Sequence, residues 1–149
     1  MIIQSFDNGF INNIKAQSIG PENKDFVMIK NLRIYVDLAI TPQEQSKGLS
    51  VKNSLKENEG MLFVFDIPSK HSFWMKDMKF PIDIIWISQQ NKIVHIERNL
   101  QPCILFLLCK SYIPNSEALY VLEVVANFTD KNNINIGDTV YLNVSKSAI

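Results

Sequence analysis

The sequence predicts a mainly β (α+β) protein: a small, mostly antiparallel barrel or sandwich with one short capped helix. Short runs rich in β-branched and aromatic residues recur along the chain, only one segment carries clear helix-capping signals, and strands do not alternate with long helices. The 149 residues are 46% hydrophobic and 20% charged, which is the balance of a folded globular protein. A single domain is therefore expected.

The N-terminal part differs in composition from the rest. Residues 1–25 are rich in Asn, Gln and Ser and are interrupted by glycine and proline, which predicts a loosely ordered extension. The β-rich domain is expected over residues 26–149. It begins with FVMIKNLRIYVDLAI, in which two β-rich runs flank Lys30 and Asn31 and are expected to pair as a hairpin. Apolar and polar residues alternate in the second run, as is typical of a half-buried strand.

The segment TPQEQSKGL carries the clearest helix signals in the chain. Thr41 suits the N-cap, Pro42 suits the first helical position, and Glu44 completes a capping box. Gly48 is expected to end the helix in a left-handed conformation. The expected helix is about two turns long, and its predicted role is to connect two strands.

Strand patterns follow one another from residue 61 to the C-terminus. The run MLFVFD is apolar on both faces, which predicts a strand buried on two sides. Further strands are expected at SFWM, IDIIWIS, KIVHIER, LYVLEVV and TVYLNV. The segment 99–118 is expected to be irregular, and a brief helical turn is expected near 126–132.

Five motifs in this order resemble a known family: TPQEQSKGLS, EGMLFVF, FWMKDMKFPIDI, YVLEV and IGDTVYL. They lie within residues 32–144, and the chain resembles the bacterial and archaeal family catalogued as Domain of Unknown Function 192. The resemblance implies a compact β-rich domain with a short helix, and it carries over no established catalytic or binding residue. Many relatives are exported.

The chain departs from this family at two places. After FWMK the family commonly has Asn and Thr, whereas this chain has Asp77 and Met78. The family tends to be polar between its two cysteines, whereas this chain has ILFLL. A polar role at residues 77–78 and a simple exposed cysteine loop are therefore not carried over from the family.

Charge and hydropathy exclude several classes of partner. Fifteen basic and fifteen acidic residues cancel, and no long basic run appears, so we expect no nucleic-acid binding. The longest apolar run, residues 104–108, is too short for a membrane span. The N-terminus lacks a signal-peptide pattern, so the chain as written is expected to be cytoplasmic, and exported if the true start lies upstream. No residue pattern decides the oligomeric state.

The cysteines Cys103 and Cys109 lie six positions apart. Two thiols are too few for a disulfide scaffold, and a closed zinc site would need His71 and His95 as further ligands. The residues leave three alternatives: unligated cysteines in or beside a loop, a local disulfide, or a metal site. No CxxC or HxxH pair provides a chelating start, so no metal or other cofactor is expected. By resemblance, the segment matches archaeal-type relatives that carry a cysteine pair there.

Single charges interrupt the apolar strands and define the candidate site. In IDIIWIS the side-chain alternation puts Asp83 on a face with isoleucines, and in YVLEVV it puts Glu123 on a face with valines. A buried carboxylate needs a hydrogen-bond donor. One interpretation is a pocket in which Trp74 forms an aromatic floor and Lys76, Asp83 and Glu123 supply polar contacts. The alternative is structural, with carboxylates bound to Lys76 or to backbone N–H groups and Trp74 in the core.

Three functional hypotheses follow, and an enzyme is not the favoured one. The leading hypothesis is a non-enzymatic β-domain that binds a small polar ligand or a protein partner at the motif 74–83. The second is a hydrolase-type enzyme that uses Asp83 and Glu123 as an acid–base pair with Lys76. The third is a purely structural accessory domain. No GxSxG, phosphate-binding or dinucleotide glycine motif is present.

Overall fold

The computed structural model describes residues 24–105 and 108–145. The predicted extension, residues 1–25, lies outside the described residues except for its last two positions, so it stays a prediction. The nine strands of these ranges are β1 (Phe26–Ile29), β2 (Leu32–Ala39), β3 (Glu59–Ser69), β4 (Phe73–Trp74), β5 (Ile82–Ile87), β6 (Ile93–Leu100), β7 (Ser111–Tyr112), β8 (Ala118–Val125) and β9 (Val140–Asn143). The helices there are α1 (Pro42–Lys47), the 3₁₀ helix η1 (Gly48–Val51) and α2 (Phe128–Lys131).

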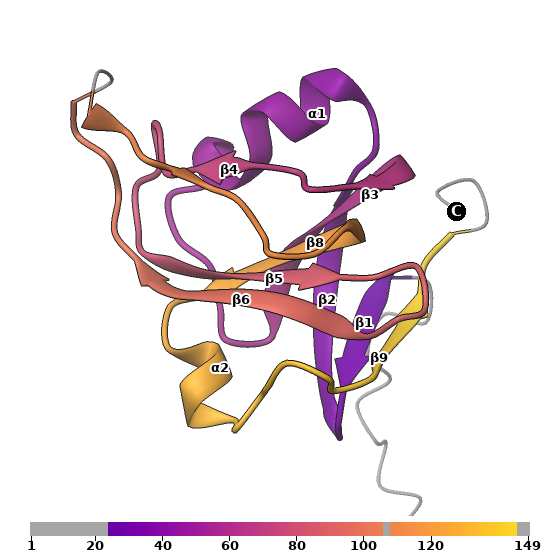
Figure 1. The fold of residues 1–149 in the computed structure, drawn as a ribbon. Coiled ribbons are helices and arrows are strands. Elements are labelled where there is room, and N and C mark those ends of the chain that lie inside the picture. The colour runs from indigo at the N-terminus through magenta and orange to yellow at the C-terminus, as the bar shows by residue number, and fades with distance from the viewer. Residues whose placement is uncertain (1–23, 106–107, 146–149) are drawn as a thin grey trace, which may run out of the picture.

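The mainly β fold is confirmed, and each predicted strand is present. Seven strands form one curled sheet in the order β6-β5-β8-β3-β2-β1-β9, and β4 pairs with β7 in a separate ribbon (Figure 1). The predicted hairpin of β1 and β2 is antiparallel, as are all neighbouring pairs of the large sheet except β2 and β3. That parallel pair requires a crossover, which the segment with α1 and η1 provides. The short strand β7 lies in the segment that was expected to be irregular.

The two edge strands of the large sheet approach each other at one end. The backbone N–H of Ile93 donates to the Asp138 carbonyl at 3.0 Å, and the N–H of Gly137 donates to the Ile93 carbonyl at 2.8 Å. The N–H of Val140 also donates to the Asn91 carbonyl at 2.9 Å. These bonds between the β6 and β9 ends close the sheet partly, so the fold is a half-barrel rather than a sandwich.

Each face of the curled sheet packs against its own apolar cluster. The inner core includes side chains from all seven strands and from the segment around α2, among them Val27, Ile34, Leu62, Ile85, Ile93, Val124, Phe128 and Val140. The outer core lies on the opposite face, under η1 and the β4–β7 ribbon, and includes Leu49, Phe63, Met75, Ile84, Trp86 and Val121. Burial on both faces explains why β5 is apolar almost throughout.

The helix α1 begins as its sequence predicts. The Thr41 hydroxyl accepts from the Glu44 N–H at 3.3 Å, and the Glu44 carboxylate accepts from the Thr41 N–H at 2.9 Å, which is a complete capping box. The end differs from the prediction: Gly48 has φ +49° but ψ −144°, so it is not in the left-handed helical region. This backbone conformation is essentially restricted to glycine. It turns the chain directly into η1 and buries Leu49 in the outer core.

Candidate functional site

The two predicted acids lie on adjacent strands but point to opposite faces of the sheet. In the antiparallel register of β5 and β8, Asp83 is opposite Val124 and Ile84 is opposite Glu123. Paired residues share a face and successive residues alternate, so Asp83 points to the side of the inner core and Glu123 to the side of the outer core. The structure therefore does not bring the four candidate residues to one cavity, and the proposed acid–base pair of Asp83 and Glu123 does not form.

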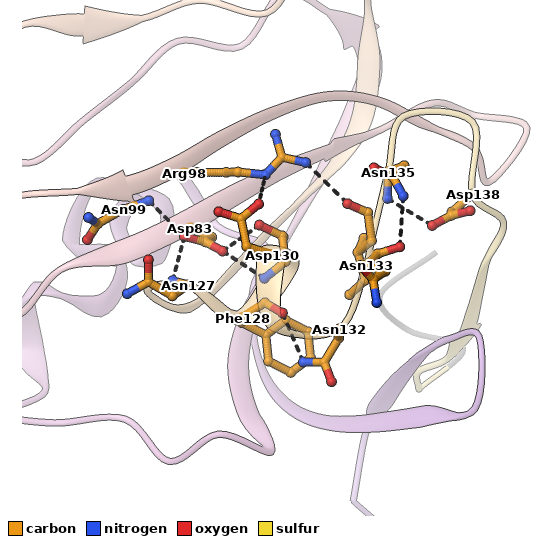
Figure 2. Close-up of polar contacts among 12 residues, drawn as sticks. Asp83, Arg98, Asn99, Asn127, Phe128, Asp130, Asn132, Asn133, Asn135 and Asp138 are labelled. Atoms are coloured by element: carbon orange, nitrogen blue, oxygen red, sulfur yellow. Dashed lines mark hydrogen bonds and ion pairs between the residues drawn. The ribbon is translucent and has the colours of Figure 1, made fainter.

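Asp83 is completely buried and accepts four hydrogen bonds (Figure 2). One carboxylate oxygen accepts from the backbone N–H groups of Asn99 at 2.8 Å and Asn127 at 3.0 Å. The other accepts from the backbone N–H of Thr129 at 2.9 Å and from its hydroxyl at 2.6 Å. With both oxygens engaged, Asp83 joins the end of β6 to the start of α2. This is the structural alternative raised for the acids, and it leaves Asp83 unsuited to hold a ligand.

The role of Asp83 is to cap α2 from a distant strand. The N-cap residue Asn127 makes no side-chain capping bond, and it adopts a left-handed conformation with φ +65°. A helix start needs acceptors for its first N–H groups, and a negative charge there is favourable. Asp83 supplies both to this four-residue helix. Figure 2 also shows Arg98, which binds the Asp130 carboxylate at 2.8 Å and the Ile134 carbonyl at 3.2 Å on the outside of the same turn.

Glu123 is also buried, with 4% of its surface exposed, but it is not fully hydrogen-bonded. It accepts a hydrogen bond from the backbone N–H of Leu49. Its Oε2 atom has no hydrogen-bond partner in the part of the chain that the structure describes. Burial raises the pKa of this carboxyl to about 8, and the Leu49 N–H opposes the shift only in part. At neutral pH Glu123 is therefore mainly protonated and can donate a hydrogen bond.

A small cavity of about 40 Å³ lies beside Glu123, large enough for a water molecule or one small polar group. The α1–η1 turn forms one side of it, and Phe63, Phe73 and the segment after β4 form the rest. Gly48 is part of the wall: a Cβ atom there would lie 3.7 Å from Glu123 Oε2 and 3.2 Å from Phe63 Cζ. The missing side chain of Gly48 thus helps to keep the cavity open.

Trp74 and Lys76 also line this cavity. The Lys76 ammonium lies 5.3 Å from the centroid of the Trp74 ring and 3.9 Å from the Asp77 carboxylate. Trp74 is 47% exposed, so the alternative that it is a core residue is wrong. The structure thus brings together Trp74, Lys76 and Glu123, and it excludes Asp83 from this cavity.

The cavity adjoins a wider cleft of about 400 Å³ along α1. The two hollows share five lining residues: Gln45, Ser46, Phe63, Phe73 and Trp74. The cleft adds Phe65 and His71, whose rings stack with centroids 3.5 Å apart. Burial lowers the pKa of His71, which favours its neutral form. The cleft wall is therefore largely aromatic.

Contacts between the cleft residues hold the wall in place. Phe73 packs edge-on against Phe63 with centroids 4.8 Å apart and against Trp86 at 5.8 Å. The Gln45 amide donates to the Val64 carbonyl at 2.9 Å, which ties α1 to β3. Sequence reasoning did not assign Gln45 or Gly48 to the site. The sequence indicates these two residues only through their position in the helix. The capping box fixes where α1 starts, and therefore which residues form its last turn.

Cys103 and Cys109 are joined in a disulfide, with their Cα atoms 5.5 Å apart. The Cys103 N–H donates to the Met75 carbonyl at 3.1 Å, and Cys103 and Lys76 form an isolated parallel bridge. The disulfide segment therefore lies directly beside Met75 and Lys76, in the segment that follows β4. Ile104, between the cysteines, is 94% exposed.

Neither a metal-binding cluster nor a membrane-spanning helix is present within residues 24–105 and 108–145. No three His, Cys, Asp or Glu side chains gather there in a way that could hold a metal ion. No helix in these ranges is long and apolar enough to cross a membrane.

Comparisons with known proteins establish the family. The family model DUF192, described as Uncharacterized ACR, matches residues 26–142, whereas no curated protein matches the chain. A protein of unknown function from Novosphingobium aromaticivorans DSM 12444 is 26% identical, with a TM-score of 0.71 over 83% of this chain and 91% of that one. A protein from Sinorhizobium meliloti 1021, described as a candidate transcription regulator, is 24% identical, with a TM-score of 0.70 over 80% and 93% of the two chains. The family model covers most of the sequence, and the chain therefore belongs to the DUF192 family.

Proposed function

We propose that this protein is a binding module that holds the polar group of a small molecule in the Glu123 cavity and the rest of that molecule in the aromatic cleft. The observation that carries the proposal is the buried Glu123 Oε2, which has no partner among the described residues and faces a cavity. A buried polar atom without a partner costs about 1–3 kcal/mol, and a leucine of similar volume would avoid that cost. Perturbed and unsatisfied groups of this kind concentrate at functional sites.

The cleft has the properties expected of a small-molecule site. Its volume of about 400 Å³ is enough for a single-ring compound, and its walls combine aromatic rings with a few polar groups. Trp74 offers a half-exposed ring at the mouth, with the Lys76 ammonium over it. Ligand binding to such a preformed wall needs little reordering.

Binding is proposed rather than hydrolysis or DNA recognition. A hydrolase with two carboxyl groups needs both acids in one site, whereas Asp83 lies on the other face and is occupied by four donors. The Sinorhizobium meliloti protein is described as a candidate transcription regulator. The present chain has equal numbers of acidic and basic residues, which does not favour a phosphate-backbone partner.

The test is a thermal-shift screen of small molecules against the full chain, followed by variants. Compounds that raise the melting temperature of the wild type are expected to lose this effect with Glu123→Leu, which keeps the volume and removes the polar atoms. Glu117→Leu, at an exposed position outside the cleft, is the matched control and should keep binding. Hits that bind Glu123→Leu as tightly as the wild type would contradict the proposal.

A further inference from the structure

We infer that the group taken by the Glu123 cavity is a hydrogen-bond acceptor of the carboxylate class, carried on a flat apolar body. This inference rests on the proposed function and specifies its ligand. It follows from the charges and the hydrogen-bonding groups that line the cavity, together with the shape and chemistry of the adjoining cleft.

The charged residues around the cavity favour an anion. Lys47 lines it from the α1–η1 turn and Lys76 from the segment after β4, and both are donors without acceptor capacity. Glu123 is the acidic lining residue of this cavity, and Asp77 lies 3.9 Å from the Lys76 ammonium without lining it. An incoming ammonium would meet two lysines, whereas an incoming carboxylate is attracted by both.

The hydrogen bonds already made inside the cavity point the same way. The Leu49 N–H is used by Glu123, the Gly48 N–H donates to the Glu44 carbonyl, and the Ser50 hydroxyl donates to the Lys47 carbonyl at 2.5 Å. The Glu123 Oε2 atom, by contrast, has no hydrogen-bond partner among the described residues and can bind a ligand. Because burial raises the pKa of the Glu123 carboxyl to about 8, the group holds a proton at neutral pH and donates it. A hydrogen bond from a carboxylic acid to a carboxylate is among the strong ones in proteins.

The shape of the adjoining cleft defines the rest of the ligand. Phe63, Phe65 and Phe73 and the stacked His71 ring present flat apolar surfaces. Aromatic rings favour stacked or edge-on contacts with another ring. An aromatic carboxylate therefore satisfies both parts of the site: its ring lies in the cleft and its carboxylate lies between Glu123 and Lys76.

The experiment compares three probes of matched size on the full chain: benzoate, benzamide and benzylammonium. Each is titrated to millimolar concentration, where ligands of this size are expected to bind, and NMR shifts of the Trp74 indole and of residues 45–50 are followed. We expect benzoate to bind about tenfold more tightly than benzamide, which corresponds to one charge-assisted bond, and benzylammonium to leave these signals unchanged.

Variants and pH test the residues assigned to this ligand. Lys76→Met is expected to weaken benzoate about tenfold, while Lys70→Met, at an exposed position that does not line either hollow, leaves it unchanged. In the wild type, benzoate affinity should fall as the pH rises through about 8, because Glu123 then loses its proton and repels the carboxylate. Glu123→Gln keeps a donor without a titration, so its benzoate affinity should not show this fall.

The outcomes separate this inference from the proposed function. Tighter binding of benzamide or benzylammonium at the same residues would overturn the carboxylate inference and leave a small-molecule site in place. Binding of benzoate that is unchanged in Lys76→Met and does not fall with pH would also overturn it. If no probe shifts these signals while library compounds of another chemistry do, only the inference fails; if no compound binds at all, both fail.

Discussion

The two buried carboxyl groups of this protein lie on neighbouring strands and show opposite states of hydrogen bonding. Asp83 on β5 accepts four hydrogen bonds, whereas Glu123 on β8 accepts one from Leu49 and has one oxygen without a partner in the described chain. Both interrupt apolar strands in the same way in the sequence. Burial of an acid is therefore a poor indicator of a site, and the number of donors around it is the better one.

A buried carboxyl group thus serves two different purposes in this protein. The backbone N–H groups of Asn99, Asn127 and Thr129 all donate to the Asp83 carboxylate. These bonds fix the junction between β6 and α2. Around Glu123 a small cavity remains, because the α1–η1 turn donates only the Leu49 N–H to the carboxyl group and Gly48 has no side chain to fill the space. The first arrangement stabilises the fold, and the second leaves room for another molecule.

The largest expected effect comes from the matched changes Asp83→Asn and Glu123→Gln. Asn at position 83 must point its NH₂ group at backbone N–H donors and loses charge-assisted bonds, so we expect a loss of about 3–5 kcal/mol in the free energy of unfolding. Gln at position 123 can keep the bond from Leu49 and place its NH₂ group toward the cavity, so stability should be unchanged or higher. Urea denaturation of both variants measures this, and equal losses would remove the distinction between the two sites.

A pH series is expected to give the next largest effect. Because the pKa of Glu123 is raised from 4.5 to about 8 in the folded state, its favourable contribution is complete below about 4.5 and is lost as the pH rises through about 8. One pKa unit corresponds to about 1.4 kcal/mol, so even half of this shift amounts to about 2 kcal/mol. The stability of Glu123→Gln minus that of the wild type should therefore increase across this range. A flat difference would mean that Glu123 is solvated or paired in the folded protein.

Gly48→Ala is expected to have an intermediate effect. The positive φ and the 3.2 Å approach to the Phe63 ring oppose a side chain, and we expect a loss of about 1–3 kcal/mol together with a narrower cavity. Gln43→Ala, at an exposed position of α1 that lines neither hollow, is the control and should change stability by less than about 0.5 kcal/mol. Urea denaturation measures both, and a neutral Gly48→Ala would show that this wall can move.

The smallest expected effect is that of Arg98→Ala. Arg98 binds Asp130 and the Ile134 carbonyl near Asp83, but the side chains of this ion pair are 36% and 66% exposed to solvent. We expect a loss of about 1 kcal/mol or less, falling further in high salt. A loss as large as that of Asp83→Asn would mean that the surface pair, and not the buried carboxylate, holds α2.

Much of the fold was predictable because its signals are local. The hairpin around Lys30, the capping box at Thr41 and the strand patterns depend on residues within a few positions of each other. The choice between a barrel and a sandwich was not predictable, since it depends on bonds between Ile93 and Asp138, far apart in the sequence. The same holds for the parallel pairing of β2 with β3.

The candidate site was predictable only in part. Glu123 was identified as a charge that interrupts an apolar strand, Trp74 as an aromatic floor and Lys76 as a cationic partner, and all three line one cavity. Asp83 was grouped with them because its sequence context looks the same. The predicted side-chain alternation within each strand was correct for both acids. It does not determine the register between β5 and β8, and this register places the two acids on opposite faces of the sheet.

The sequence by itself determined the strands, the capped helix, the family and the identity of the buried charges, because each of these is encoded by spacing along the chain. Only the tertiary structure decided that Asp83 is surrounded by hydrogen-bond donors and that Glu123 lines a cavity. The register of β5 against β8 and the turn at Gly48 set that outcome. Both depend on packing between distant segments, and a shift of one residue in this register would place Asp83 opposite Glu123, on the same face of the sheet.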